Sequence, residues 1–217
     1  GSITPGRRAD FIVTSSIEDL PIDAVFARGE RVAENGKLLT KCPHYDWPQS
    51  VRETVNLGKK LGFKDFSISL PSGLSSIKAK VIGVIENQAP TKALEFDLPV
   101  EQEKVKLVKD VCYLSLVERH RGTGKVVNGF VSGFGYTGSM AIASSVAHDS
   151  HHMIVVGTNQ DMMASAANRL GEVGGGVSVW KDGSELALVE LPIAGLMSDS
   201  KASEVAVKTQ AIISAMS

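Results

Sequence analysis

The chain has 217 residues, of which 43% are hydrophobic and 22% are charged, as expected of a globular protein that buries a core. Its 23 basic and 24 acidic side chains give a formal net charge of −1, which argues against a surface for nucleic acids or anionic membranes. We recognise no signal peptide and no apolar run near the ~20 residues that span a bilayer, so we expect a cytoplasmic protein.

The first 40 or so residues contain only short strands and turns. A turn at residues 1–6 precedes an apolar strand at residues 11–13, which we expect to be buried. Strands at residues 24–27 and 31–33 flank a turn and predict a hairpin. Three short strands cannot make a stable core alone. They therefore complete a sheet with a part of the protein that precedes this sequence, or they lean on the rest of the chain.

A connector at residues 41–50, with two prolines in ten residues, divides the chain. We predict two domains, residues 1–45 and residues 46–217. The second domain opens with a short predicted helix at residues 51–61 and with apolar-polar alternation at residues 63–70, which is typical of a half-buried strand.

The remainder has a mixed α/β pattern, so the predicted fold class is α/β of the mixed α+β kind. Helical spacing predicts one helix over residues 161–172 with Asn159 as its N-cap, and a last helix over residues 201–215. Asp182 and Gly183 predict a hairpin turn between two strands. The predicted strands are residues 80–86, 112–118, 126–134, 141–147, 153–156, 177–180 and 186–191.

The main candidate site is a histidine cluster at residues 148–152, where three of the five histidines lie together with Asp149 and Ser150. Imidazole suits proton transfer near neutral pH and metal binding, and a carboxylate can orient it. If the cluster lies on a turn, His148 and His151 can converge on one point. The alternative is a polar hairpin tip whose histidines only bond backbone groups.

A second, weaker candidate is the stretch from Glu118 to Arg121, at the end of a predicted strand. Glu118 and His120 could present a carboxylate and an imidazole at a cleft. The alternative is a solvated, charged strand end.

Two other patterns carry little chemistry. The glycine spacing from Gly133 to Gly138 lacks the helix and the acidic residue that complete a dinucleotide site, so it favours a close backbone turn. Cys42 and Cys112 are far apart and form no CxxC pair, which predicts buried or idle thiols.

Several stretches resemble one known family. Residues 1–10 (Gly-Ser-Ile-Thr-Pro-Gly-Arg-Arg-Ala-Asp), followed by an apolar strand, are similar to the closing segment of amidohydrolase-superfamily enzymes. There the chain leaves a metal-binding barrel and adds strands to a small β-sandwich. Residues 144–151, 154–159 and 191–198, with the shorter motifs at 167–170 and 174–176, resemble the C-terminal domain of adenine deaminases of that superfamily. His152 departs from the asparagine that is usual in the family.

The resemblance implies an enzyme that hydrolyses adenine to hypoxanthine and ammonia in purine salvage. It also implies a pair of divalent metal ions, manganese or iron, in a (β/α)8 barrel whose ligands precede this sequence. We therefore expect no metal or cofactor site in this chain, no activity of the chain alone, and a homo-oligomer of the intact enzyme with the barrel domain.

Two functions for residues 46–217 remain open. In the first, His148, Asp149, Ser150 and His151 reach the active site, where they orient the purine or transfer a proton to the leaving ammonia, or bind a further metal ion. In the second, the domain is a non-catalytic packing and oligomerisation module, and the histidines are structural.

Overall fold

The structure is a computed structural model that describes residues 2–41, 44–136 and 138–216. Cys42 and Thr137, which belong to patterns discussed above, lie outside the described residues. The chain divides into two compact units, Gly1–Asp46 and Trp47–Ser217. Helices and sheets are both present, so the predicted mixed α/β class is confirmed.

Unit 1 is one antiparallel sheet in the order β1-β2-β3-β4. Its strands are β1 (Phe11–Val13), β2 (Ala24–Ala27), β3 (Glu30–Glu34) and β4 (Lys37–Leu38). The rings of the cross-strand partners Phe11 and Phe26 stack with their centroids 4.7 Å apart. None of the described residues of this unit is buried, and Ile12 is 52% exposed. The prediction of a strand at residues 11–13 is therefore right and its predicted burial is wrong, because the described residues of unit 1 form a single sheet.

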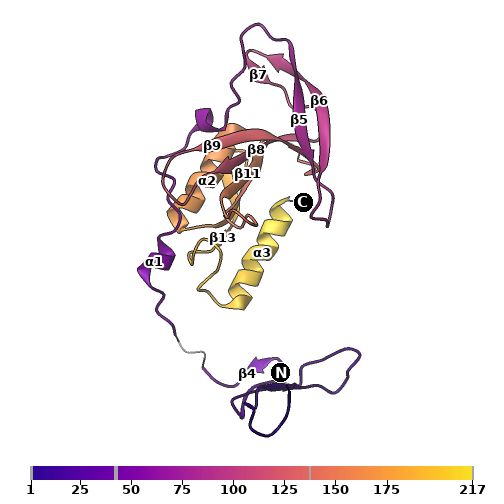
Figure 1. Cartoon of the computed structure of the whole chain (residues 1–217), viewed down its shortest axis with the longest axis vertical. Coiled ribbons are helices and arrows are strands. Elements are labelled where there is room, and N and C mark those ends of the chain that lie inside the picture. Colours follow the sequence, from indigo (N-terminus) through magenta and orange to yellow (C-terminus); the bar gives the residue numbers. More distant parts are fainter. Residues whose placement is uncertain (1, 42–43, 137, 217) are drawn as a thin grey trace. The chain divides into compact units, whose positions relative to one another are not determined.

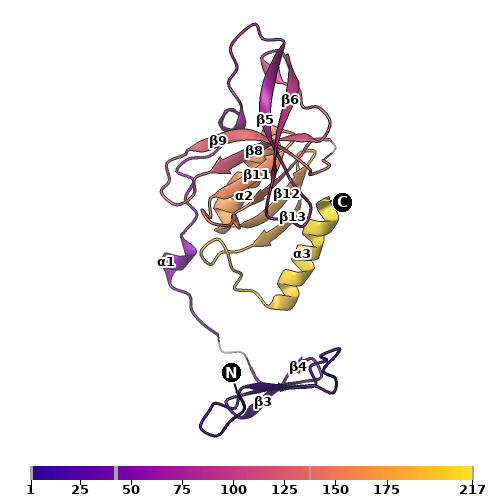
Figure 2. The same cartoon turned by 45° about the vertical axis from the view of Figure 1, so that its right-hand side comes forward.

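Unit 2 is built on a nine-stranded sheet in the order β13-β12-β10-β11-β8-β9-β5-β6-β7 (Figures 1 and 2). Every neighbouring pair is antiparallel except β5 and β9, which meet in parallel over two residue pairs. The strands are β5 (Ser76–Gly83), β6 (Lys92–Glu101), β7 (Lys104–Val105), β8 (Val111–Val117), β9 (Val126–Ser132), β10 (Met140–Ser144), β11 (Met153–Gly157), β12 (Gly176–Lys181) and β13 (Ser184–Glu190).

Helix α2 (Gln160–Val173) packs over β10, β11 and β12 on one face of this sheet. It begins after Asn159, whose side chain accepts the N–H groups of residues 161 and 162, and it ends at Gly174 with a φ of 80°. These caps satisfy backbone groups that the helix itself leaves free, and the N-cap confirms the prediction. The helix buries Met163 and Leu170 against the core.

Helix α3 (Ala202–Met216) lies beside β12 and β13 and buries Ile212 against Val179 (Figures 1 and 2). Trp180, the next residue of β12, packs into the core under α2. Since successive side chains of a strand point to opposite faces, α2 and α3 pack on opposite sides of β12. Among the described residues, no helix is long and apolar enough to cross a membrane.

Two predictions for the start of unit 2 are wrong. Helix α1 (Gln49–Arg52) has only four residues, and residues 63–70 open with a 3-10 helix, η1 (Phe63–Phe66), in place of a strand. Tertiary hydrogen bonds replace the expected helical ones. The Asn56 N–H donates to the Arg119 carbonyl at 2.8 Å, and the Asn168 side chain bonds both the N–H and the carbonyl of Leu61 at 2.9 Å each.

Cys112 lies on the sheet face opposite α2 as a buried, free thiol, which agrees with the prediction of an idle cysteine. Burial, helped by the negative charge of Asp110, raises the pKa of this thiol to about 11. The thiol therefore stays protonated at neutral pH, and a reactive thiolate is not formed there.

Candidate functional site

The histidine cluster lies on the loop between β10 and β11, which we call the histidine loop (residues 145–152). Ser145 anchors its first stem in the core. The buried Ser145 hydroxyl donates to the Gly195 carbonyl at 2.6 Å and accepts the Gly176 N–H at 2.7 Å. Ala147 is also buried. The loop is therefore held at its base by groups from two other segments.

The tip of the loop is a tight turn, as the sequence predicted. The His151 N–H donates to the Ala147 carbonyl at 2.9 Å, and Asp149 and His151 have left-handed φ angles of 69° and 50°. Such angles are uncommon outside glycine, so the turn depends on its surroundings. Nδ1 of His148 lies 2.8 Å from the Asp149 carboxylate, and both side chains are at least 90% exposed. His148 is thus paired with its own neighbour in solvent.

The structure joins the two clusters that the sequence presented separately. The rings of His120 and His152 lie with centroids 5.0 Å apart, and Nε2 of His120 is 3.2 Å from the Ser150 carbonyl. Nδ1 of His152 is buried and has no hydrogen-bond partner among the described residues. Pairing of Val117 in β8 with Met153 in β11 brings the two segments together. Only knowledge of this strand pairing could have indicated the contact.

The Arg119 side chain holds the backbone of the histidine loop in place. Only 1% of its surface is exposed, and Nε donates to the His151 carbonyl at 2.6 Å. Its other two nitrogens donate to the carbonyls of Thr54 and Ala194, both at 3.3 Å. Desolvation lowers the pKa of this guanidinium, but an arginine remains charged in proteins. Arg119 therefore ties the histidine loop to two distant segments, which its place in a charged run did not indicate.

Glu118 caps the loop that follows β8. Its carboxylate accepts the N–H groups of His120, Arg121 and Thr123 and the Thr123 hydroxyl, at 2.6 to 3.1 Å. Desolvation alone would raise the pKa of Glu118, but these donors outweigh it and lower the pKa to about 2. Glu118 is therefore ionised at neutral pH and already saturated with donors. The prediction that Glu118 and His120 contribute to catalysis stays a prediction.

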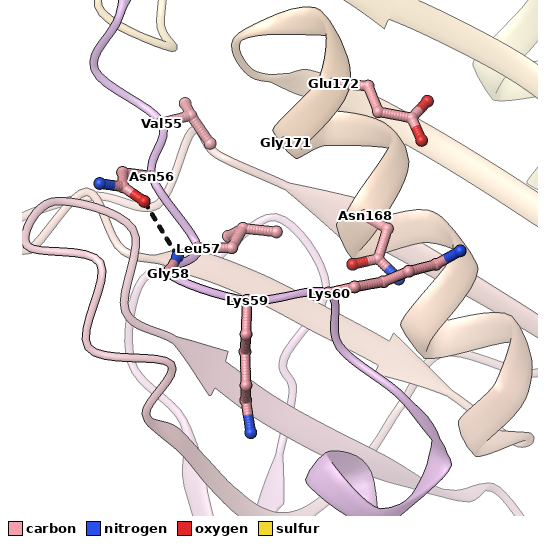
Figure 3. A pocket seen from close by; sticks show the side chains of 9 residues that line it. All are labelled: Val55, Asn56, Leu57, Gly58, Lys59, Lys60, Asn168, Gly171 and Glu172. Atoms are coloured by element: carbon pink, nitrogen blue, oxygen red, sulfur yellow. Dashed lines mark hydrogen bonds between the residues drawn. The ribbon is translucent and has the colours of Figure 1, made fainter.

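A hollow of about 490 Å³ lies between residues 55–60 and α2 (Figure 3). Figure 3 shows the Lys59 side chain pointing away from α2 and the Lys60 side chain extending towards it beside Asn168. Two of the polar side chains that line the hollow serve internal bonds: the Asn56 amide oxygen accepts the Gly58 N–H, and Lys59 pairs with Asp65. We therefore place the candidate site at the histidine loop and not in this hollow.

Metal-binding groups do not gather in this part of the protein. Within residues 2–41, 44–136 and 138–216, no three His, Cys, Asp or Glu side chains are close enough together to hold an ion. We therefore assign no metal ligand to the described residues.

Comparison with known proteins identifies the family. Residues 88–217 match the family described as the adenine deaminase C-terminal domain. The chain belongs to this family. Over its whole length it is 64% identical to proteins named adenine deaminase from Ruegeria pomeroyi and Roseobacter denitrificans. Over 98% of its length it is 41% identical to the adenine deaminase of Moorella thermoacetica.

This chain spans 36% of the length of each of these three relatives. The histidine loop and α2 both lie within the part that matches the adenine deaminase C-terminal domain. Unit 1 lies outside that match.

Proposed function

We propose that this chain is part of an adenine deaminase, a hydrolase that converts adenine and water into hypoxanthine and ammonia. The observation that carries this proposal is 64% identity, over the whole chain, to proteins that bear that name. The enzyme would act in purine salvage in the cytoplasm and form a homo-oligomer.

The proposed reaction uses a divalent metal ion, manganese or iron, which lowers the pKa of a bound water and so supplies the nucleophile. The described residues do not fit such a metal site, as the absence of a ligand cluster among them indicates. We therefore derive no metal-dependent step from this chain, and we propose that a (β/α)8 barrel elsewhere in the enzyme holds the metal and the adenine.

We further propose that residues 1–45 supply strands to a small β-sandwich, and that residues 46–217 form the C-terminal α/β domain. The sheet of unit 1 supports the first part, because none of its described residues is buried, the stacked Phe11 and Phe26 included. A second sheet over this one would bury those rings.

For the histidine loop we propose a role at the active site of the intact enzyme. His148, Asp149, Ser150 and His151 would orient the purine or transfer a proton to the leaving ammonia, with Glu118 and His120 as weaker contributors. The support is geometric. Ser145 fixes the stem of the loop in the core, and the tip of the loop carries the exposed His148 imidazole beside the Asp149 carboxylate.

The alternative is a packing and oligomerisation module. The bonds of Arg119 and Ser145 favour it, because they explain the shape of the loop without any substrate. Two measurements test these proposals: the first tests whether the chain alone is inactive, and the second separates the catalytic loop from the packing module. The 217-residue chain alone, incubated with adenine and manganese, should release no ammonia above background. Metal-dependent ammonia release that survives further purification would contradict the proposal that a barrel elsewhere in the enzyme holds the metal and the adenine.

In the full-length enzyme, His148→Ala and His151→Ala should each lower kcat/KM by a factor of ~100 with unchanged melting, equivalent to roughly 2.7 kcal/mol of transition-state stabilisation. A lower melting temperature with normal kinetics of the folded enzyme would favour the packing module instead.

A further inference from the structure

The sheet face opposite α2 exposes part of β8, β9 and β11, at the end next to the histidine loop. Leu116, Val127 and Ile154 lie there in one row across three strands, since Leu116 pairs with Val127 on one side and with Ile154 on the other. Their exposed fractions are 36%, 55% and 37%. Three aliphatic side chains are therefore presented side by side to the outside. We call this row, with its surroundings on the same strands, the open face.

The open face carries no charge among its described residues. An exposed face of an antiparallel sheet normally carries polar side chains. Here the sheet positions on this side of β8–β11 are uncharged. Cys112, Val131, Met140 and Val156 are already buried there, and the positions that stay at least partly exposed are Leu114, Leu116, Val127, Gly129, Ile142, Ser144 and Ile154. A partner could cover them without removing any charge from water, which is the main cost of burying a protein surface.

The open face also adjoins the histidine loop. Ile154 follows His152 by two residues, and Val146, 51% exposed, lies on the other stem of the loop. On its far side the face is bounded by α3, which covers β12 and β13. A body that covers Leu116 and Ile154 must therefore also approach the histidine loop.

We propose that the open face docks the remaining, larger part of the same enzyme. The relatives extend well beyond this region, which makes up 36% of their length, so a large body of the same polypeptide is available at high local concentration. The inference rests on the proposed function, which brings the histidine loop to the active site in that larger part. If the larger part docks on the uncharged face beside the histidine loop, the loop lies next to that larger part and can reach its active site.

The test is chemical labelling of one introduced cysteine at a time, read at its own peptide by mass spectrometry, in a background where Cys42 is replaced by serine and the buried Cys112 is kept. Val127→Cys and Ile154→Cys report on the open face, and Val207→Cys on α3, where the residue is 72% exposed, is the control. Each variant is made in the 217-residue chain and in the full-length enzyme. We expect the two reporters to react at least tenfold more slowly in the full-length enzyme, while the control reacts at the same rate in both.

Equal rates for the reporters in both proteins would overturn the proposal. Slow labelling that recovers on hundredfold dilution, with a matching fall in mass by light scattering, would assign the face to a second copy and overturn it too. Ammonia release by the same full-length variants keeps the two claims apart. A protected face in an enzyme that does not deaminate adenine contradicts only the proposed function, and a freely labelled face in an active enzyme contradicts only the docking.

Discussion

The two units of this chain contain sheets whose strands pair in a similar way but whose side chains differ in burial. Unit 1 has four paired strands, a stacked pair of phenylalanines and no buried residue among those described. Unit 2 pairs its strands in the same antiparallel way except for β5 with β9, but α2 packs on the sheet and excludes water from Ala143 and Leu170. Both units have a backbone hydrogen-bond ladder, but only in unit 2 do the described residues form a second layer on the sheet.

This difference shows which interaction makes a sheet stable. A backbone hydrogen bond contributes only ~1 kcal/mol net, because the unfolded chain bonds to water. Burying one large aliphatic side chain contributes about 1.5–3 kcal/mol. Unit 1 has the first contribution without the second, so its cohesion in the intact protein depends on what covers it. Four predictions test this contrast, in order of expected effect.

The largest effect is expected in the core of unit 2. Leu170→Ala removes a fully buried side chain between α2 and the sheet, so the free energy of unfolding should fall by about 2–5 kcal/mol. Denaturant titration measures it. Val207→Ala, at an exposed position of α3, is the matched control and should change little. A similar loss in both variants would mean that burial does not distinguish these positions.

The next effect concerns the Glu118 cap. Glu118→Gln removes the charge that holds four donors, and at neutral pH it should cost ~1.5–3 kcal/mol. The pKa is lowered in the folded chain, to about 2 from the ordinary value of 4.5, so this stabilisation is complete above pH 4.5 and is lost as the pH falls towards 2. The stability gap between the unmodified chain and the variant should therefore close over that range. Glu86→Gln, at an exposed position, should show no such gap.

A smaller effect is expected at the base of the histidine loop. Ser145→Ala leaves the Gly195 carbonyl and the Gly176 N–H without their partner, at a cost of about 1–2 kcal/mol. Amide exchange at residues 147–152 should accelerate. Ser76→Ala, at an exposed position of β5, is the control and should leave those amides as they were. Unchanged exchange in the Ser145 variant would show that Arg119 alone holds the loop.

The smallest effect is expected in unit 1. Ile12→Ser changes a side chain that is already 52% exposed, so the stability of the 217-residue chain should change by less than ~0.5 kcal/mol. Residues 2–40 should also exchange their amide protons faster than residues 110–190. A loss of a kilocalorie or more, or equal protection, would reveal a cover for this sheet, such as a second copy of the chain.

Much of unit 2 could be predicted from the sequence alone because its signals are local. Asn159 begins α2 through its own side chain, and Gly174 ends it in a left-handed conformation. Asp182 and Gly183 turn β12 into β13 with positive φ angles of 48° and 86°. Even β6, for which no strand was predicted, carries a signal in the alternation of Leu94, Phe96 and Leu98. The position of the histidine loop between two strands and the family motifs could also be predicted from local sequence.

Contacts between distant segments decided the rest. Residues 51–61 have helical spacing, but bonds to Arg119 and Asn168 hold most of them in another conformation. His120 contacts His152 only because β8 pairs with β11. Arg119 stands in a charged run of the sequence, but it is buried and donates to three carbonyls from separate parts of the chain. Each of these outcomes depends on a partner more than 30 positions away, and no local pattern specifies which distant group a side chain will meet.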